Sequence, residues 1–353
     1  MSSPTLSRTV FHVGSYCVPG AYFHATGEGL TACALDEVTG EISRLSVRKD
    51  VGNAGWLARS GGLLVVAADH YLEAGEISAS TLRDGGTSEN LGAPQSSMGG
   101  AFCHVAISPN GRTAFAASYL GGLIVHHLDS NDGVSAAHQH ITYSGSGPNK
   151  ERQGESHPHQ AAVTPDGSQV LVCDLGCDKI WVHPFDGTSL GEAVGIAIQP
   201  GSGPRHLVIH PKLPRLYLMC ELDAKLRVLE ATGQTWREIA VHATLPDEFT
   251  GEPAGCAIHF HPGGKSLLVS NRNSNSITVF AVNAAGDLAR AAVFPCQGET
   301  PREFAISPSG RWLLVVNQDS HQIVPFELDP ASGLPTGHAG PAFACGSPMC
   351  LTF

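Results

Sequence analysis

Residues 302–329 read REFAISPSGRWLLVVNQDSHQIVPFELD and contain three strand-like segments joined by two short turns. The first turn, SPSG, combines Pro and Gly, which favour tight turns because Pro fixes φ and Gly accepts positive φ. The segments beside it are rich in Val, Leu, Ile and Phe, residue types that are enriched in strands. The stretch therefore predicts an antiparallel three-stranded unit.

The same order of strand, turn, strand, short turn and strand recurs elsewhere in the chain. It is present in residues 103–129, 159–186, 205–230 and 256–283, and a weaker copy begins at Trp56. The turn prolines of the five clear copies lie 46 to 56 residues apart. This period is typical of a four-stranded propeller blade.

The two ends of the chain contain complementary parts of one further unit. RTVFHVGSY and GLTACALD lack a first strand before them, whereas the C-terminal SPMCLTF resembles a first strand with nothing after it. Pairing the two ends would close a ring and remove exposed sheet edges. We expect an all-β, seven-bladed β-propeller with four-stranded blades, as a single domain over residues 1–353. The split blade comprises 9–53 plus 348–353, and the other blades start near 54, 103, 157, 204, 256 and 301.

Composition agrees with this architecture and excludes several classes of function. The chain has 41 Gly and 23 Pro among 353 residues, as expected of many short strands with tight turns. A net charge of −11 argues against nucleic-acid binding, although a small anion could still bind to a few Arg in a pocket. The ten Cys lack the close spacing of a disulfide framework, which favours reduced thiols.

Several targeting and cofactor signals are missing from the sequence. No segment has the length of a signal peptide or of a membrane span, so we expect a soluble cytoplasmic protein without membrane contact. No Gly-rich loop opens a helix and no Gly-x-Ser-x-Gly elbow is present. The paired histidines lack a third ligand at suitable spacing, so we expect neither a metal nor another cofactor. A closed ring needs no partner, so we expect a monomer or a weak homodimer.

One end of the ring gathers the polar residues of the inner strands. In each repeat, the start of the first strand and the end of the antiparallel second strand fall at the same end. Polar side chains at such positions have to face water or a ligand, because buried unpaired charges are costly. We therefore expect a site at the mouth of the central channel. The positions are Cys103, His159, Arg205, Cys256 and Arg302 at first-strand starts, and Tyr16, His70, Tyr119, Leu175, Glu221, Arg272 and Gln318 at second-strand ends.

A long loop precedes one of these inner strands. Residues 144–160 read SGSGPNKERQGESHPHQ, a composition that excludes a regular helix or strand. Because the loop enters the next blade at the same end of the ring, it can form a lid or wall of the site. It would bring Asn149, Arg152, Gln153 and His157 to the channel mouth.

Several stretches together resemble one known family. They are GSGPNKERQGESHPH (145–159), GSGPRHLVIHP (201–211), MCELDAKL (219–226), SNRNSNSITVF (270–280) and ETPREFAISPSGRWLLVVNQDS (299–320). These stretches resemble the seven-bladed lactonase family, which includes bacterial propeller-type 6-phosphogluconolactonase and fungal carboxy-cis,cis-muconate cyclase. The resemblance covers nearly the whole chain, but the first blades depart from the family pattern.

The resemblance implies that the catalytic residues are His157, Arg205, Glu221 and Arg272. Two guanidinium groups beside one carboxylate leave a positive excess that suits a carboxylate or phosphate. An imidazole is suited to activate water near neutral pH. In this hypothesis, His157 or Glu221 deprotonates the attacking water and the other protonates the leaving ring oxygen. Glu221 with Arg272 could instead be a structural ion pair, and His157 a surface histidine.

The function expected is therefore hydrolysis of a small anionic or sugar-derived lactone, similar to 6-phosphogluconolactone. A carboxymuconate-type cycloisomerase needs the same anion-binding groups and remains an alternative, as does a non-catalytic propeller that binds proteins. The substrate-binding residues expected around the catalytic group are His159, Arg152, Asn149, Gln153, Tyr119, Arg302, Gln318 and His70.

Overall fold

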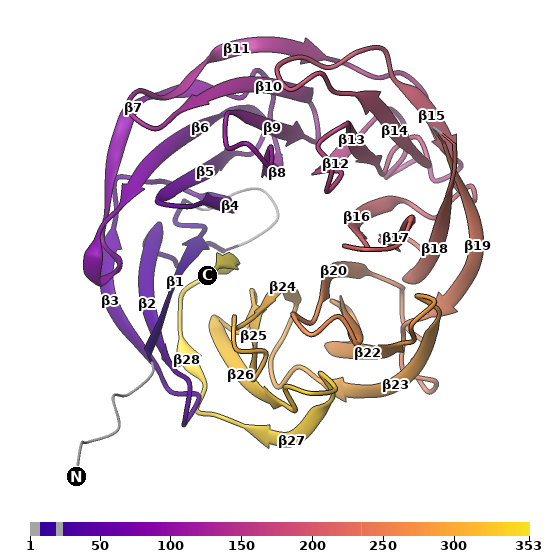
Figure 1. Cartoon of the computed structure of the whole chain (residues 1–353). Coiled ribbons are helices and arrows are strands. Elements are labelled where there is room, and N and C mark those ends of the chain that lie inside the picture. Colours follow the sequence, from indigo (N-terminus) through magenta and orange to yellow (C-terminus); the bar gives the residue numbers. More distant parts are fainter. Residues whose placement is uncertain (1–7, 19–23, 234) are drawn as a thin grey trace.

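The computed structural model describes residues 8–18, 24–233 and 235–353, and these form a closed ring of antiparallel β-sheets (Figure 1). There are seven sheets, and they follow one another around the ring in sequence order. The expected seven-bladed β-propeller is confirmed. Apart from strands, the described residues contain only the three-residue 3-10 helix η1 (Asp84–Gly86).

We number the blades from the one that contains both chain ends, and give their strands from the inner to the outer edge. Blade 1 is β29 (Pro348–Thr352), β1 (Arg8–Ser15), β2 (Leu30–Asp36) and β3 (Ile42–Arg48); blade 2 is β4 (Ala54–Ser60), β5 (Leu63–His70), β6 (Glu73–Leu82) and β7 (Ser88–Ser96); blade 3 is β8 (Phe102–Ile107), β9 (Thr113–Ser118), β10 (Gly122–Asp129) and β11 (Gly133–Ile141); blade 4 is β12 (Pro158–Val163), β13 (Gln169–Asp174), β14 (Lys179–Pro184) and β15 (Val194–Ala197). Blade 5 is β16 (Pro204–Ile209), β17 (Arg215–Cys220), β18 (Lys225–Thr232) and β19 (Thr235–Ala243); blade 6 is β20 (Gly255–Phe260), β21 (Ser266–Asn271), β22 (Ser276–Val282) and β23 (Leu288–Pro295); blade 7 is β24 (Pro301–Ile306), β25 (Trp312–Asn317), β26 (Gln322–Leu328) and β27 (Pro335–Ala339), with β28 (Phe343–Ala344) also pairing with β26.

The ring closes by pairing the two ends of the chain. β29 is antiparallel to β1, with Val13 opposite Leu351 and Gly14 opposite Cys350. The rings of Phe11 and Phe353 lie 5.4 Å apart beside this pairing. An inner strand from one terminus therefore completes a blade that the other terminus begins, which removes two sheet edges.

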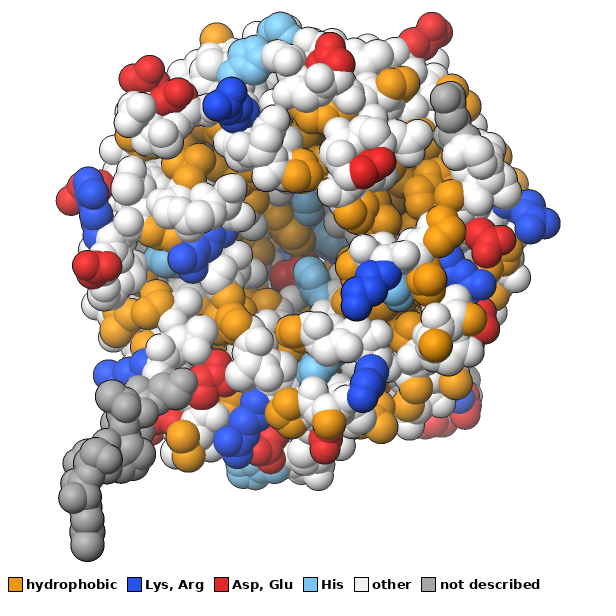
Figure 2. All heavy atoms as spheres, viewed as in Figure 1, with side chains coloured by type: hydrophobic (Ala, Val, Ile, Leu, Met, Phe, Trp, Pro, Cys, Tyr) orange, Lys and Arg blue, Asp and Glu red, His pale blue; other side chains and the backbone are white. Residues whose placement is uncertain are grey.

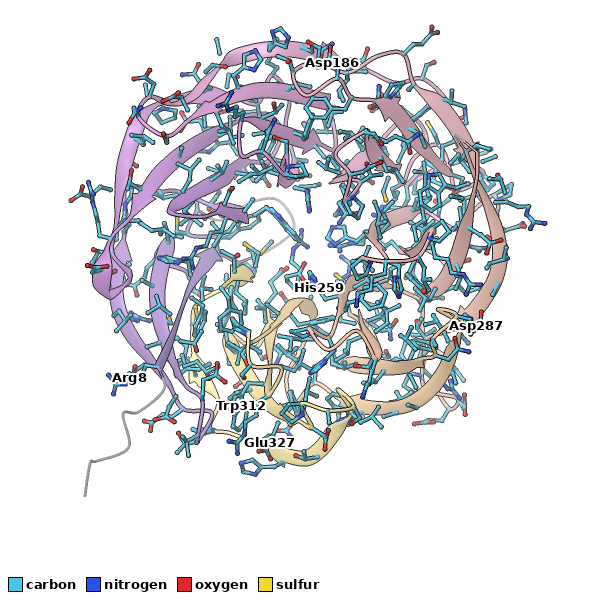
Figure 3. The ribbon with its side chains drawn as sticks, viewed as in Figure 1. Arg8, Asp186, His259, Asp287, Trp312 and Glu327 are labelled. Carbon is cyan, nitrogen blue, oxygen red and sulfur yellow. The ribbon has the colours of Figure 1, made fainter. Side chains whose placement is uncertain are left out.

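The hydrophobic core is divided among the interfaces between neighbouring blades. Leu171 and Ile180 of blade 4, for example, belong to one buried cluster with Leu207 and Leu218 of blade 5. The charged residues Asp186, Asp287 and Glu327 lie at the outer part of the ring, whereas His259 lies near its centre (Figure 3). On the face seen in Figure 2 the ring is hollowed at its centre, and histidine side chains line the hollow. The channel is thus the polar part of an otherwise apolar interior.

A repeated irregularity begins the inner strands. The register between first and second strands shifts at the same place in every blade. Such bulges redirect a side chain and are frequent at the rims of barrels and next to active sites. The residues in the shifts are Gly55, Cys103, His159, Arg205, Cys256, Arg302 and Met349.

A repeated backbone hydrogen bond marks the second-strand ends. The amide that follows each second strand donates to a carbonyl just before a first strand, for example Glu221 to Gly203 and Arg272 to Ala254. In blade 2 this donor is Asp69, which bonds to Asn53, and not His70. His70 was therefore placed one residue out of register by the sequence pattern. The equivalent positions are Tyr16, Asp69, Tyr119, Leu175, Glu221, Arg272 and Gln318.

Candidate active site

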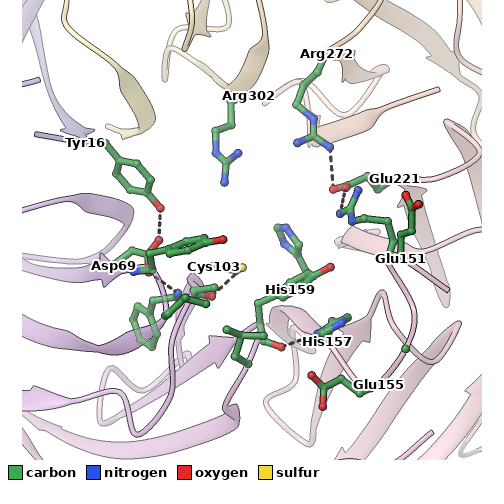
Figure 4. A pocket seen from close by; sticks show the side chains of 18 of the residues that line it. Tyr16, Asp69, Cys103, Glu151, Glu155, His157, His159, Glu221, Arg272 and Arg302 are labelled. Carbon is green, nitrogen blue, oxygen red and sulfur yellow. Dashed lines mark hydrogen bonds and ion pairs between the residues drawn. The ribbon is translucent and has the colours of Figure 1, made fainter. Parts of the chain in front are cut away.

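A cavity of about 950 Å³ opens at the end of the ring where these two rows of residues meet (Figure 4). It is lined by strand-end residues of all seven blades and by Lys150, Glu151, Arg152, Gly154, Glu155 and His157 of the long loop. Among the sequence-predicted residues, its lining contains Tyr119, Arg152, His157, His159, Glu221, Arg272, Arg302 and Gln318. The structure thus brings most of the predicted residues to one cavity.

Glu221 is the centre of a cluster of three arginines. Its side chain is only 4% exposed. Its Oε2 lies 2.9 Å from a guanidinium nitrogen of Arg272 and 3.1 Å from Nε of Arg205, and its Oε1 lies 2.6 Å from Arg152. The three arginines come from blade 6, blade 5 and the long loop. One buried carboxylate therefore fixes three guanidinium groups from different parts of the chain.

This cluster sets the charge of Glu221. Burial alone would raise the pKa of its carboxyl, but Arg272, Arg205 and Arg152 together hold that pKa well below its ordinary value. Glu221 is therefore a carboxylate at neutral pH and has no proton to donate. The expectation that Glu221 protonates the leaving oxygen conflicts with this charge state.

The arginines of the cluster are not equivalent. Arg272 lines the cavity, and its side chain is 19% exposed. Arg205 is buried and does not line the described part of the cavity. One of its terminal nitrogens lies 3.3 and 3.4 Å from the two ring nitrogens of His206, so it lies over the face of that imidazole. Arg205 therefore supports Glu221 from behind, and direct contact with a ligand is left to Arg272.

His157 is held in a defined orientation at the cavity wall. Its ring stacks on Tyr119 with centroids 4.0 Å apart and an interplanar angle of 9°. Its backbone amide donates to Asp174, and its Nδ1 lies 3.0 Å from the carbonyl oxygen of Tyr119. Because a carbonyl can only accept, Nδ1 carries a proton. In the neutral imidazole, the lone pair therefore lies on Nε2, where it can accept a proton.

Arg302 differs from the other cavity arginines. Its side chain extends into the open part of the cavity (Figure 4). Within the described residues, its guanidinium makes no ion pair or hydrogen bond, although Arg152, Arg205 and Arg272 all pair with Glu221. In the same blade, the buried Oε1 of Gln318 also lacks a hydrogen-bond partner among described residues. The guanidinium of Arg302 and the hydrogen-bond acceptor Oε1 of Gln318 are thus available to bind a ligand.

Two predicted loop residues stabilise the loop and do not line the described cavity. The side chain of Asn149 accepts hydrogen bonds from the amides of Glu151 and Arg152 and is otherwise exposed. Gln153 is fully buried, donates to the carbonyl of Leu175 and accepts from the amide of Asn149. The expected ligand contacts of these two residues are replaced by contacts that shape the loop around Arg152 and His157.

His70 also lies away from the described cavity lining. It is exposed and pairs with Glu73 in β6. Asp69 occupies the strand-end position that was expected for His70. It accepts hydrogen bonds from the Tyr16 hydroxyl at 2.7 Å and from the amides of Tyr71 and Phe102. The sequence signal that could have found Asp69 is the repeated strand-end position. The count along blade 2 was one residue too long and selected His70 instead.

Three histidine rings from blades 3, 4 and 5 lie next to one another beside the cavity. His159 lines the cavity, is 6% exposed and lies 5.1 Å from the ring of His206, which in turn lies 5.7 Å from His104. Burial and the nearby Arg205 hold the pKa of His159 well below its ordinary value, so it is neutral. Within the described residues, no group of three or more His, Cys, Asp or Glu side chains could hold a metal ion.

The cysteines are not part of the chemistry of this cavity. All ten are free thiols. Cys103 lines the cavity, but burial raises the pKa of its thiol to about 12. A thiol with this pKa is protonated at neutral pH and is a poor nucleophile.

A helix of the length and apolar character that a membrane crossing demands is absent from the described residues.

Comparison with known proteins gives a consistent result. The family described as "Lactonase, 7-bladed beta-propeller" matches residues 12–353. The chain is 29% identical over 308 residues to 6-phosphogluconolactonase of Bacillus subtilis (strain 168), covering 86% of each protein. The structure of a periplasmic gluconolactonase from Pseudomonas aeruginosa superimposes with a TM-score of 0.90 and 28% identity, covering 98% of this chain and 99% of that one. A protein of known structure from Lactobacillus plantarum gives 0.87 and 26%, covering 98% and 99%.

Proposed function

Because the chain belongs to the seven-bladed β-propeller lactonase family, we propose that it hydrolyses a small anionic lactone in the cavity at the mouth of the central channel. The observation that carries the proposal is that His157 and Glu221 line the same cavity, and that Glu221 forms ion pairs with three arginines. A base can activate the attacking water, and a fixed array of cations can stabilise the negative charge that develops on the lactone carbonyl oxygen.

In the proposed reaction, Nε2 of His157 accepts a proton from a water molecule as the water oxygen bonds to the lactone carbonyl carbon. Negative charge develops on the carbonyl oxygen, and Arg272 donates hydrogen bonds to it. The ring C–O bond then breaks, and the imidazolium returns its proton to the leaving oxygen. The product is an open-chain hydroxy acid.

Glu221 and Arg205 act as positioning residues in this scheme. Glu221 remains ionised because its pKa is lowered, and its two oxygens hold Arg272 and Arg152 at the cavity while Arg205 supports it from below. A cation array that is already in place needs little reorganisation when charge develops in the transition state.

Arg302 is the proposed binding residue for an anionic substituent of the substrate. Its guanidinium has no carboxylate partner within the described residues, and it lies in the same cavity as Arg272. A guanidinium can hold a carboxylate or phosphate with two hydrogen bonds. The free Oε1 of Gln318 would accept a hydrogen bond from a hydroxyl group of the same ligand.

The experiment is an acid-release assay at constant pH with a panel of lactones. The panel contains 6-phosphogluconolactone, glucono- and galactonolactone and a muconolactone, with Arg272→Ala measured in parallel to subtract spontaneous hydrolysis. Wild-type rates above those of the variant on an anionic lactone are expected. Arg302→Gln should raise KM for that lactone about tenfold or more, since a hydrogen bond to a charged group contributes about 1.5–3 kcal/mol. Equal rates for wild type and Arg272→Ala on every lactone would contradict the proposal.

A further inference from the structure

Large apolar side chains are exposed along one part of the cavity rim. Leu72 is 68% exposed and Leu120 is 45% exposed, and both line the cavity. Met98, 49% exposed, lies in the loop between β7 and β8. Exposed apolar side chains at a cavity are typical of a binding site, because water contact with them is unfavourable.

The turn that contains Leu72 has Tyr71 at a position whose backbone conformation is unfavourable for a tyrosine. β5 and β6 are joined by the two residues Tyr71 and Leu72, since His70 pairs with Glu73. Tyr71 has φ 62°, a left-handed conformation that Gly or Asn adopts most readily in such turns. Strained residues of this kind cluster at ligand sites. Both residues of this turn, Tyr71 and Leu72, line the cavity.

Close backbone contacts fix this part of the rim. The amide of Ala101 donates to the carbonyl of Tyr71 at 2.5 Å, and the amide of Leu120 donates to the carbonyl of Gly100 at 3.2 Å. A Cβ on Gly100 would lie 2.3 Å from the carbonyl oxygen of Tyr71, so only glycine allows this packing. Tyr71, Leu72 and Leu120 therefore belong to one wall that is formed before a ligand binds.

Arg272 lies on the other side of the ring from these leucines. Leu72 and Leu120 belong to blades 2 and 3, whereas Arg272 belongs to blade 6. In a ring of seven, blade 6 is three blades away from each of them by the shorter route, which is the largest separation possible. The cavity volume of about 950 Å³ is near the upper end of the range for small-molecule pockets, about 300–1,000 Å³. The cavity can thus hold a ligand that spans from the cations to the apolar wall.

We propose that Tyr71, Leu72 and Leu120 form an apolar subsite that binds an alkyl or aryl substituent of the lactone. The substrate would then be an amphiphilic molecule, with its lactone and anionic group at Arg272 and Arg302 and its apolar substituent against blades 2 and 3. This inference rests on the proposed function for the identity of the ligand as a lactone or its hydroxy-acid product. The contacts of the wall itself do not depend on turnover.

Two compounds and their hydrolysis products test the subsite. The first is a five-membered lactone that carries a carboxylate, and the second is the same lactone with an n-butyl substituent on the ring. Affinity for the two open-chain hydroxy acids is measured by calorimetry for wild type, Leu72→Ser, Leu120→Ser and Val194→Ser. Val194 is 62% exposed on β15, outside the described cavity lining, and is the matched control. Thermal unfolding of each variant is measured in parallel.

Wild type and Val194→Ser should bind the butyl hydroxy acid at least tenfold more tightly than the hydroxy acid without the butyl group. The reason is that each buried methylene raises the affinity about fourfold. In Leu72→Ser and Leu120→Ser this preference should fall severalfold without a change in melting temperature. Equal affinity of wild type for both hydroxy acids, or a preference that both serine variants retain, would overturn the subsite. Acid release from the two lactones is recorded separately. Butyl-dependent binding without turnover would contradict the proposed lactonase activity and leave the apolar subsite supported.

Discussion

At the scale of single residues, the site depends on Glu221. A buried carboxylate that lacked partners would be protonated, yet the three arginines around this one keep it ionised. Removing one member of a buried charge cluster leaves the others uncompensated, which is strongly destabilising. Glu221 therefore contributes to the stability of the protein as well as to the geometry of Arg272.

Glu221→Gln should lower stability in a pH-dependent way. The pKa of Glu221 in the folded protein lies below its ordinary value of 4.5, so its contribution is fully present above about pH 4.5 and is lost as the pH falls toward the folded pKa. At pH 7 we expect the variant to be less stable by about 3–5 kcal/mol. Urea unfolding of both proteins between pH 3 and 7 should show this difference shrinking on the acid side.

A surface carboxylate is the control for this measurement. Glu89 pairs with Arg83, and both side chains are more than half exposed. Glu89→Gln should change stability by about 1 kcal/mol or less. If the two glutamine variants lost similar stability at pH 7, the cluster around Glu221 would not be the strong interaction that its geometry indicates.

At the scale of elements, the strand ends decide which side chains reach the cavity. The repeat in the sequence was sufficient to place Glu221, Arg272 and Arg302, because each stands at a fixed distance from a turn Pro or Gly. It failed at blade 2, where two adjacent glycines, Gly61 and Gly62, follow the first strand. Gly61 has the positive φ that the turn glycines of blades 3, 4, 6 and 7 share, so the count has to start there and reaches Asp69, whereas a count from Gly62 reaches His70.

Contacts between different repeats were also beyond the reach of the sequence pattern. The ion pair of Arg152 with Glu221 joins the long loop to blade 5, and the hydrogen bond of Tyr16 to Asp69 joins blades 1 and 2. A repeat specifies the position of each residue in its own blade. It does not specify how far a long side chain extends toward a neighbour, so the Arg152 contact with Glu221 and the buried, non-lining position of Arg205 required the folded chain.

Asp69→Ala and His70→Ala test the register of β5. Asp69 accepts three hydrogen bonds in a buried position, so its loss should destabilise the protein by about 3 kcal/mol or more, at about 1–3 kcal/mol per unsatisfied group. His70 is exposed, and its replacement should change stability by about 0.5 kcal/mol or less. Chemical denaturation of the two variants checks this order, and a larger loss in His70→Ala would mean that the register is wrong.

At the scale of the whole molecule, the ring holds the site together. Residues from blades 4, 5, 6 and 7 and from the long loop meet in one cavity, and none of these blades could place them alone. The protein has a net charge of −11, yet three arginines line the cavity, and Arg205 lies behind them against Glu221. The fold thus gathers four guanidinium groups at one end of the channel in an acidic protein.

Removing β29 tests the closure of the ring. A chain that ends before Pro348 should expose the edge of β1 and the buried cluster that includes Phe11 and Leu351. We expect aggregation or a melting temperature at least 10 °C lower, measured by size-exclusion chromatography and calorimetry. A permuted chain that carries residues 347–353 on a short linker before Arg8 should recover a folded monomeric ring. A truncated protein with unchanged melting temperature would contradict the role of β29.

The most direct test of the central claim is kcat/KM of His157→Asn on the best lactone of the panel, after subtraction of spontaneous hydrolysis. The asparagine amide can still donate to the carbonyl of Tyr119, as Nδ1 does, but it offers no base in place of Nε2. His138→Asn, at an exposed position on β11, is the control. We predict a loss of about 10²–10⁴-fold with an unchanged melting temperature, the usual contribution of general acid–base catalysis. A rate within threefold of wild type would show that His157 does not activate the water and would contradict the account.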